Sequence, residues 1–192
     1  AKLAVCSPDY KSKKYSKKII TTKNVRKTLS YACAKFFKTK PKNIIAITGT
    51  NGKSSIADFF HQILQAQKIP VATIGTLGVK KNKKSKKIDL TSPDIISLHK
   101  ELSSIKKANI NNVIIEASSH GLHQGRLDGI NFKAGVFSNF SQDHLDYHNS
   151  MKHYFKAKMI LFNRLLKKNK YVISDSKIKE FKKIKIIINK RK

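Results

Sequence analysis

The chain has 192 residues and two cysteines, and 41 Lys and Arg against 11 Asp and Glu give it a formal net charge of +30. This length suits one principal domain with a hydrophobic core and excludes two large ones. Cys6 and Cys33 form neither a disulfide framework nor a metal-ligand spacing, and no signal peptide or run of about 18 apolar residues occurs, so we expect a cytoplasmic protein without a membrane segment.

Residues 1–42 are basic and weakly patterned, although residues 25–37 carry apolar side chains at helical spacing. We expect a lead-in segment with one amphipathic helix. At residue 43 the pattern changes to a short β-branched run, residues 44–47, which is followed at once by a glycine-containing turn. This pattern predicts a buried strand that enters a loop.

A helix is predicted after that loop and before Pro70, because apolar residues recur at i, i+3, i+4, i+7 and i+8. They are Ile56, Phe59, Phe60, Ile63 and Leu64. The order of strand, glycine loop and helix is typical of phosphate-binding sites.

The rest of the chain alternates predicted strands and helices. The strands are expected at residues 71–74, 113–116, 135–138 and 171–174, and the helices at 150–165 and from Ser92, with Pro93 as the first helical residue. Residues 80–87 are lysine-rich, as in a solvated hairpin tip or loop. The alternation predicts an α/β fold with a mostly parallel sheet flanked by helices.

The loop of residues 48–54 has the residue types of a phosphate-binding loop. Its backbone N–H groups would cradle phosphate oxygens, Lys53 would reach the β- and γ-phosphates, and the Ser54 hydroxyl would ligate Mg²⁺. The usual pattern GxxxxGK[ST] needs glycine at position 47, where this chain has Ile47. On this pattern alone, an ordinary turn stays open as an alternative.

The string TGTNGKSS (residues 48–55) resembles the loop TGTNGK[ST][ST] of the Mur ligase and folylpolyglutamate synthase superfamily. Four later segments match MurE-type Mur ligases in the same order: LTSPD (90–94), EASSHGL (116–122), QGRLDG (124–129) and SNFSQDHLDYH (138–148). The resemblance, over roughly residues 25–175, implies the P-loop-type central domain of a Mur ligase, with ATP and Mg²⁺ as cofactors. It further implies that the third amino acid, meso-diaminopimelate or lysine, is added to UDP-N-acetylmuramoyl-L-Ala-D-Glu through an acyl phosphate.

The resemblance also assigns residues to ATP and Mg²⁺. ATP would contact Gly49, Thr50, Asn51, Gly52, Lys53, Ser54, Ser55 and Asn139, and Mg²⁺ would be ligated by Ser54, Glu116, His144 and Lys158. Lys53, His144 and Lys158 would be catalytic. Without the resemblance, a glutamate at a strand end is more often a solvated surface residue, and His144 with His148 at i, i+4 could suggest zinc, although no further ligand is spaced to complete a zinc site.

Lys158 lies within the apolar stripe of the helix predicted at residues 150–165, so it should point toward the core, unlike Lys152 and Lys156. Desolvation lowers the pKa of a lysine, and a neutral amine can capture CO₂ as a carbamate. The string YFKAK (residues 154–158) resembles the family segment in which this lysine is carbamylated. The alternative is a lysine whose charged end reaches back to solvent.

The muramyl nucleotide would be bound, by the same resemblance, by Thr91 and Ser92 at its phosphate and sugar portion, with Ser118, Gln124 and Arg126 nearby. Thr91 and Ser92 stand where the family usually has two threonines, so both hydroxyls are kept. An arginine beside a hydroxyl is chemically suited to a pyrophosphate or carboxylate.

The domain organisation implied by the resemblance is incomplete. Residues 1–42 would be the tail of a UDP-binding domain with its linker helix, residues 43–192 a central ATP-binding domain cut short at its carboxyl end, and the carboxy-terminal ligase domain would be absent. We therefore expect that the chain alone does not ligate, unless a companion chain supplies the missing parts.

Two other hypotheses remain open on the sequence: an inert remnant of a Mur ligase, or a basic P-loop protein that binds nucleic acid. The charge favours polyanions. The lysines are nevertheless spread along the chain, as in compositional drift, and no nucleic-acid-binding motif occurs, so we expect no specific nucleic acid partner.

Overall fold

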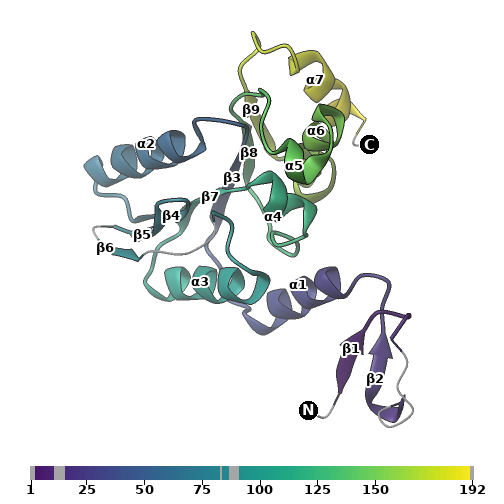
Figure 1. Cartoon of the computed structure of the whole chain (residues 1–192). Helices are drawn as coiled ribbons and strands as arrows, with labels where there is room; N and C mark the ends of the chain where they lie inside the picture. The colour runs from purple at the N-terminus through teal and green to yellow at the C-terminus, as the bar shows by residue number, and fades with distance from the viewer. Residues whose placement is uncertain (1–2, 11–15, 83, 87–90, 191–192) are drawn as a thin grey trace.

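The computed structural model of the chain describes residues 3–10, 16–82, 84–86 and 91–190 (Figure 1). A seven-stranded sheet has the order β6-β5-β4-β7-β3-β8-β9. Its strands are β3 (Asn43–Thr48), β4 (Val71–Gly75), β5 (Gly78–Lys81), β6 (Lys84–Lys86), β7 (Asn112–Glu116), β8 (Ala134–Phe137) and β9 (Tyr171–Ser174). Neighbouring strands from β4 to β9 pair in parallel, whereas β5 and β6 pair antiparallel. The predicted mostly parallel α/β sheet is confirmed.

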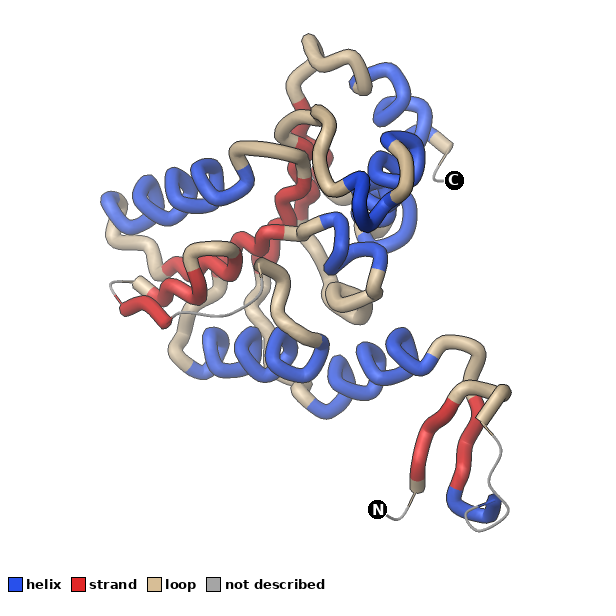
Figure 2. Tube along the Cα trace, in the orientation of Figure 1, coloured by secondary structure: helices blue, strands red, loops and turns tan. Residues whose placement is uncertain are grey.

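Helices cover both faces of this sheet, as Figure 2 shows with strands in red and helices in blue. They are α1 (Val25–Phe36), α2 (Lys53–Ala66), α3 (Ile95–Lys107), α4 (Ser119–His123), α5 (Leu145–His148), α6 (Met151–Ile160), the π-helical turn η2 (Leu161–Leu165) and α7 (Phe181–Asn189). In the described part of the chain, no helix has the length and apolar character needed to cross a membrane.

Residues of β3 alternate between two hydrophobic cores. Ile44 and Ala46 belong to the larger core, which includes Leu98 and Leu102 of α3, whereas Ile47 packs in a smaller core under α2. Because side chains of a strand point alternately to opposite faces, a strand covered on both faces needs a continuous apolar run. The sequence of residues 44–47 meets this requirement and sets β3 in the middle of the fold.

The predicted apolar face of α2 is partly wrong. Phe59 and Ile63 are 60% and 59% exposed, while Ala57 and His61 are buried. The helix begins at Lys53, directly after the loop, and from this start it turns the small Ala57 side chain toward the sheet. The spacing therefore predicted the helix correctly but did not fix its rotation about its axis.

The predicted start of α3 is also wrong. Its N-cap is Asp94, whose carboxylate accepts hydrogen bonds from the backbone N–H groups of Ile96 and Ser97, each at 3.0 Å. The Ser92 hydroxyl donates instead to the carbonyl oxygen of Glu116, at 2.9 Å. A serine hydroxyl engaged with a neighbouring strand cannot cap a helix, so the helix starts two residues later than that cap implied.

The helix predicted at residues 150–165 is confirmed as α6 followed by η2, with Ser150 as its N-cap. Lys158 is 1% exposed, as its place in the apolar stripe predicted, whereas Lys152 and Lys156 are exposed. The lysine-rich segment predicted as a hairpin tip or loop is confirmed where described, in β5, Asn82 and β6; residues 83 and 87 lie outside the described residues.

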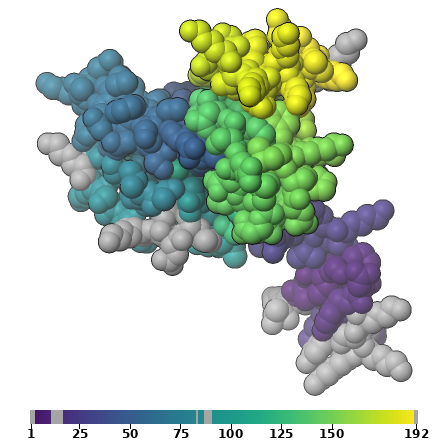
Figure 3. Space-filling view, turned by 45° about the horizontal axis from the view of Figure 1, so that its top comes forward, coloured from purple at the N-terminus to yellow at the C-terminus, as the bar shows by residue number. Residues whose placement is uncertain are grey.

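The amino-terminal segment contains the predicted helix α1, which packs against α3. It also contains a parallel two-stranded sheet that was not predicted, formed by β1 (Ala4–Cys6) and β2 (Ile19–Thr21), with a 3-10 turn η1 (Ser16–Lys18) between them. Figure 3 shows this segment in purple, projecting from the main body. Strands of three residues carry too few side chains for an alternating pattern to be recognised.

Candidate phosphate-binding site

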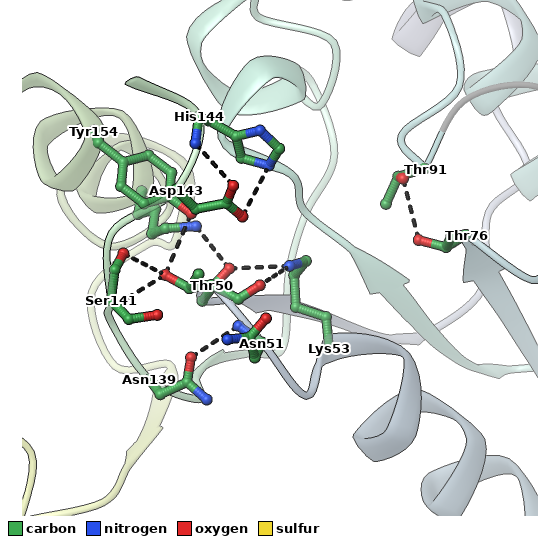
Figure 4. A network of polar contacts seen from close by, with 12 residues as sticks. Thr50, Asn51, Lys53, Thr76, Thr91, Asn139, Ser141, Asp143, His144 and Tyr154 are labelled. Carbon is green, nitrogen blue, oxygen red and sulfur yellow. Dashed lines mark hydrogen bonds and ion pairs between the residues drawn. The ribbon is translucent and has the colours of Figure 1, made fainter. Parts of the chain in front are cut away.

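The loop between β3 and α2 is held in place by the segment that follows β8 (Figure 4). The backbone N–H of Thr50 donates to the Asn139 carbonyl oxygen at 3.1 Å, and that of Asn51 donates to the Asn139 side-chain oxygen at 2.8 Å. The Ser138 hydroxyl donates to the carbonyl oxygen of Asn51 at 2.7 Å. The loop is therefore shaped by protein contacts, and a ligand would find it preorganised.

Two glycines let the loop take this shape. Gly52 has φ +80, in the left-handed region that favours glycine, and directly precedes α2. A Cβ atom at Gly49 would lie 1.9 Å from the Ser138 hydroxyl oxygen. Ile47 lies within β3 and is fully buried, so the chain has a core residue where GxxxxGK[ST] has glycine. The departure from that pattern leaves the loop intact.

Two lysines converge on one carbonyl oxygen of the loop. Nζ of Lys53 donates to the carbonyl oxygens of Gly49 (3.0 Å) and Thr50 (2.7 Å), and Nζ of Lys158 donates to that of Gly49 (2.6 Å). Burial lowers the pKa of Lys53. Burial, and then the neighbouring charge of Lys53, lower the pKa of Lys158 to about 7. Two crowded, desolvated amines make the loop a favourable place for an anion.

The Glu116 carboxylate lies at the carboxyl end of β7 and is 2% exposed. Its Oε2 atom accepts from the hydroxyls of Ser54 (2.9 Å) and Thr76 (3.1 Å), and Oε1 accepts from the backbone N–H of Thr76 (3.0 Å). Sequence reasoning missed Thr76. The available signal was its position in Gly75-Thr76-Leu77-Gly78, directly after a strand of the parallel sheet.

His144 and Asp143 lie across the loop from Lys53, as Figure 4 shows. Nε2 of His144 is 3.4 Å from Oδ2 of Asp143, and its ring centroid is 5.0 Å from that of His120. In the described parts of the chain, no three His, Cys, Asp or Glu side chains converge as metal ligands. His144 with His148 therefore gives no zinc site of this kind, and burial followed by neighbouring histidines lowers the pKa of His148 to about 4.

The donor atoms around Glu116 fit magnesium better than a softer metal. Mg²⁺ prefers oxygen ligands, keeps several waters and is usually held by one or two carboxylates together with substrate phosphates. Ser54 and Glu116 supply a hydroxyl and a carboxylate beside the loop. Lys158 has no lone pair to offer while its amine is protonated, so as a ligand it would have to be modified first.

Tyr154, the first residue of the string YFKAK, connects the loop, helix α6 and the segment after β8. Its hydroxyl donates to Oγ1 of Thr50 at 3.3 Å, and Nζ of Lys158 lies 4.2 Å from its ring centroid. Oγ1 of Thr50 in turn donates to the Ser141 carbonyl oxygen and accepts from its N–H, at 3.1 and 3.0 Å. Partners about 100 residues apart gave no local signal.

The residues predicted to bind the muramyl nucleotide lie together. Arg126 donates from Nη1 to the Ser92 carbonyl oxygen (2.8 Å) and from Nε (3.0 Å) and Nη2 (2.6 Å) to Oε1 of Gln124. Hydroxyls of Ser92 and Ser118 are 3.1 Å apart, and Oγ1 of Thr91 is 3.1 Å from Oγ1 of Thr76. Ser92 is 1% exposed, so its hydroxyl is engaged inside the protein.

Ser55 is exposed on the first turn of α2 beside Ser54. The first N–H groups of a helix can bind an anion. The preformed loop, the helix that follows it and the carboxylate lie at the carboxyl edge of a parallel sheet, where open α/β sheets bind ligands. An α/β domain with a glycine loop of the phosphate-binding type is the class of protein that this fold and this site define.

Comparison with known proteins gives the family. The Mur ligase middle domain matches residues 47–191, and the chain belongs to the Mur ligase family. The chain is similar to UDP-N-acetylmuramoyl-L-alanyl-D-glutamate--2,6-diaminopimelate ligase of Bradyrhizobium diazoefficiens, with 44% identity over 147 residues, 77% of this chain and 30% of that protein. The protein of the same name in Rickettsia bellii is 39% identical over 184 residues, 94% of this chain and 39% of that protein.

A solved structure of a UDP-N-acetylmuramoyl-L-alanyl-D-glutamate--2,6-diaminopimelate ligase has the same fold. It superposes with a TM-score of 0.81 at 29% identity, over 91% of this chain and 36% of that chain. The sequence resemblance to the MurE type is thereby confirmed. The chain spans 30% and 39% of the length of these two relatives.

Proposed function

We propose that this chain supplies the ATP and Mg²⁺ site of a ligase that joins 2,6-diaminopimelate to UDP-N-acetylmuramoyl-L-alanyl-D-glutamate. The observation that carries the proposal is the buried Glu116 carboxylate bound to Ser54 beside a loop that is already shaped for phosphate. The names of its relatives supply the reaction and the amino acid.

In this proposal ATP lies along the loop, with its phosphates on the backbone N–H groups that begin α2. Lys53 turns from the carbonyl oxygens of Gly49 and Thr50 toward the phosphates, and Asn139 keeps the loop in shape. Ser54 and Glu116 would hold Mg²⁺, which would neutralise phosphate charge. The substrate carboxylate can then approach a phosphorus atom without facing its full negative charge.

Lys158 has the environment that carbamylation requires. With a pKa of about 7, a large fraction of its amine is neutral at physiological pH and can attack CO₂. The new N–C bond forms as one C=O π bond of CO₂ opens, the nitrogen releases one proton to solvent, and the neutral amine becomes a carbamate anion. We propose that this carbamate would be a ligand of Mg²⁺ and that His144 would be a ligand of a second Mg²⁺ ion, as the family resemblance implies.

The acceptor nucleotide would lie at the Thr91 end of the site. Arg126, held by Gln124 and by the Ser92 carbonyl oxygen, presents a fixed guanidinium to a phosphate or carboxylate of the substrate. Thr91 and Ser118 add hydroxyl groups at the same edge of the sheet. Ser92 would act mainly by holding Arg126 and the end of β7 in place.

We propose that residues 1–42 connect to a uridine-binding part, that residues 43–192 form the ATP-binding part, and that ligation needs the remaining length found in the relatives. That length would be supplied by the same polypeptide or by a companion chain. The diaminopimelate amine has to be brought to the activated carboxylate, and positioning of this kind is a large part of catalysis.

A chimera tests the proposed function. The aligned 184 residues of the Rickettsia bellii ligase are replaced by this chain, and product formation from ATP, diaminopimelate and the UDP-muramyl dipeptide is measured. We expect the chimera to form product and this chain alone to form none. The same chimera with Lys53→Ala should be slower by about 100-fold or more, since a phosphate-stabilising charge is lost.

Lys107→Ala is the matched control, because Lys107 is an exposed lysine in the last turn of α3. It should leave the rate unchanged. A chimera that binds ATP but forms no product with diaminopimelate would contradict the proposed ligase.

A further inference from the structure

We propose that Thr76 is a positioning residue that fixes the metal-binding carboxylate Glu116 and connects it to Thr91, at the acceptor end of the site. This inference rests on the proposed function and adds a residue that the family resemblance did not assign. The contacts of Thr76 with Glu116 and with Thr91 carry it, and Figure 4 shows the contact with Thr91.

The position of Thr76 follows from the turn that contains it. Strands β4 and β5 are antiparallel, and Gly75 pairs with Gly78, so Thr76 and Leu77 form a two-residue hairpin turn. Gly78 has φ +93, which a side chain would disfavour. This tight turn directs both the N–H and the hydroxyl of Thr76 to the end of β7.

Glu116 is constrained on the side of Gly75 as well. A Cβ atom on Gly75 would lie 2.0 Å from Oε1 and 2.5 Å from Cγ of Glu116, so the glutamate side chain packs directly on the glycine. The carboxylate above it receives two hydrogen bonds from Thr76 and one from Ser54. Two of these three bonds come from one residue, and this residue therefore sets the orientation of the carboxylate.

The direction of the hydrogen bonds follows from their chemistry. An ionised carboxylate only accepts, and a threonine hydroxyl has a single proton. When the Thr76 hydroxyl donates to Oε2 of Glu116, it must accept from Thr91, whose Oγ1 atom is 3.1 Å away. The result is a chain of hydrogen bonds, from Thr91 to Thr76 and from Thr76 to Glu116.

This series of hydrogen bonds joins the two ends of the site. A cation at Oε2 of Glu116 would meet a carboxylate that the hydroxyls of Ser54 and Thr76 already hold in one orientation. Loss of the Thr76 hydroxyl removes the acceptor of the Thr91 proton, so that the Thr91 hydroxyl is free to donate to a ligand instead. Residues that orient a metal ligand commonly affect metal affinity by 10- to 100-fold, so the effect is large enough to measure.

Calorimetry of ATP binding with Mg²⁺ and with EDTA tests the role of Thr76. The ratio of the two affinities measures the contribution of the metal. We expect Thr76→Val, which keeps the shape but loses the hydroxyl, to lower this ratio by about 10-fold and to leave the affinity in EDTA unchanged. Thr76→Ser should keep the ratio. Thr39→Val is the matched control, since its hydroxyl pairs with Ser103 instead.

The connection to Thr91 is tested by combining substitutions. Thr91→Val should lower the ratio less than Thr76→Val does, and the double variant should equal Thr76→Val, because the second substitution acts through the first. Additive effects would overturn the proposed connection.

The proposed role of Thr76 is overturned if Thr76→Val and the unsubstituted chain have the same ratio of ATP affinities with Mg²⁺ and with EDTA. Thr76→Ala, which removes bulk, gives the same test should the valine variant not fold. If the unsubstituted chain shows no ATP binding, the proposed function fails, and this outcome is distinct from a failure at Thr76 alone.

Discussion

The amine of Lys158 is buried, and the amount by which its burial lowers the free energy of unfolding depends on pH. Its pKa is about 7 in the folded chain and 10.5 ordinarily, so between these values the unfolded chain binds one more proton than the folded chain. The free energy of unfolding then rises with pH by about 1.4 kcal/mol per pH unit from this group. Below pH 7 both states are protonated and the full cost of burial remains.

Lys158→Met removes this dependence. In CO₂-free buffer, the variant should gain the most free energy of unfolding relative to the unsubstituted chain below pH 7, and this advantage should shrink as the pH rises from 7 toward 10. Denaturant unfolding at several pH values measures the difference. An advantage that does not change with pH would show that the amine of Lys158 has an ordinary pKa.

Single residues were predictable where a local pattern positioned them. Helical spacing predicted that Lys158 is buried, and the structure confirms it. The contacts of Thr76 and Tyr154 were missed, since their partners Glu116 and Thr50 are 40 and 104 residues away in the chain. Such contacts depend on the order of strands in the sheet, which no local pattern contains.

Among the elements, the segment after β8 supports the phosphate-binding loop. Asn139 accepts a hydrogen bond from the N–H of Asn51 through its side chain, so Asn139→Ala leaves this N–H without its partner. Because such a bond contributes about 1 kcal/mol, the affinity for ATP should fall about 5-fold while the melting temperature changes little. Calorimetry and thermal unfolding measure both quantities.

Asn43→Ala is the control for that prediction, since the Asn43 side chain also has a hydrogen bond to a distant residue: it donates to the side-chain oxygen of Asn112, at the other end of these strands. It should leave the affinity for ATP unchanged. Equal affinity losses in the two variants would show that the Asn139 contact has no special part in shaping the loop.

The boundaries of elements were harder to predict than their types. The start of α3 was wrong because Ser92 and Asp94 are both good helix caps, and only the contact of Ser92 with β7 decides between them. The rotation of α2 was wrong because its sequence has apolar residues on more than one side. In both elements, packing against the sheet determines what the local pattern leaves open.

At the scale of the whole molecule, the alternation of strands and helices sufficed to predict a mostly parallel sheet. The strand order could not be derived from it: β7 lies between β4 and β3, and this order brings Glu116 next to both Gly75 and the loop. The site is therefore assembled by the topology of the sheet, from segments that are far apart in the sequence.

Calorimetric titration of ATP in Mg²⁺ into the purified chain, beside its Lys53→Ala and Lys107→Ala variants, tests most directly whether this sheet carries a working nucleotide site. We predict binding that the Lys107 variant keeps and the Lys53 variant loses, since only Lys53 lies on the loop. A folded chain that binds no ATP, or that binds it equally well without Lys53, would contradict the account.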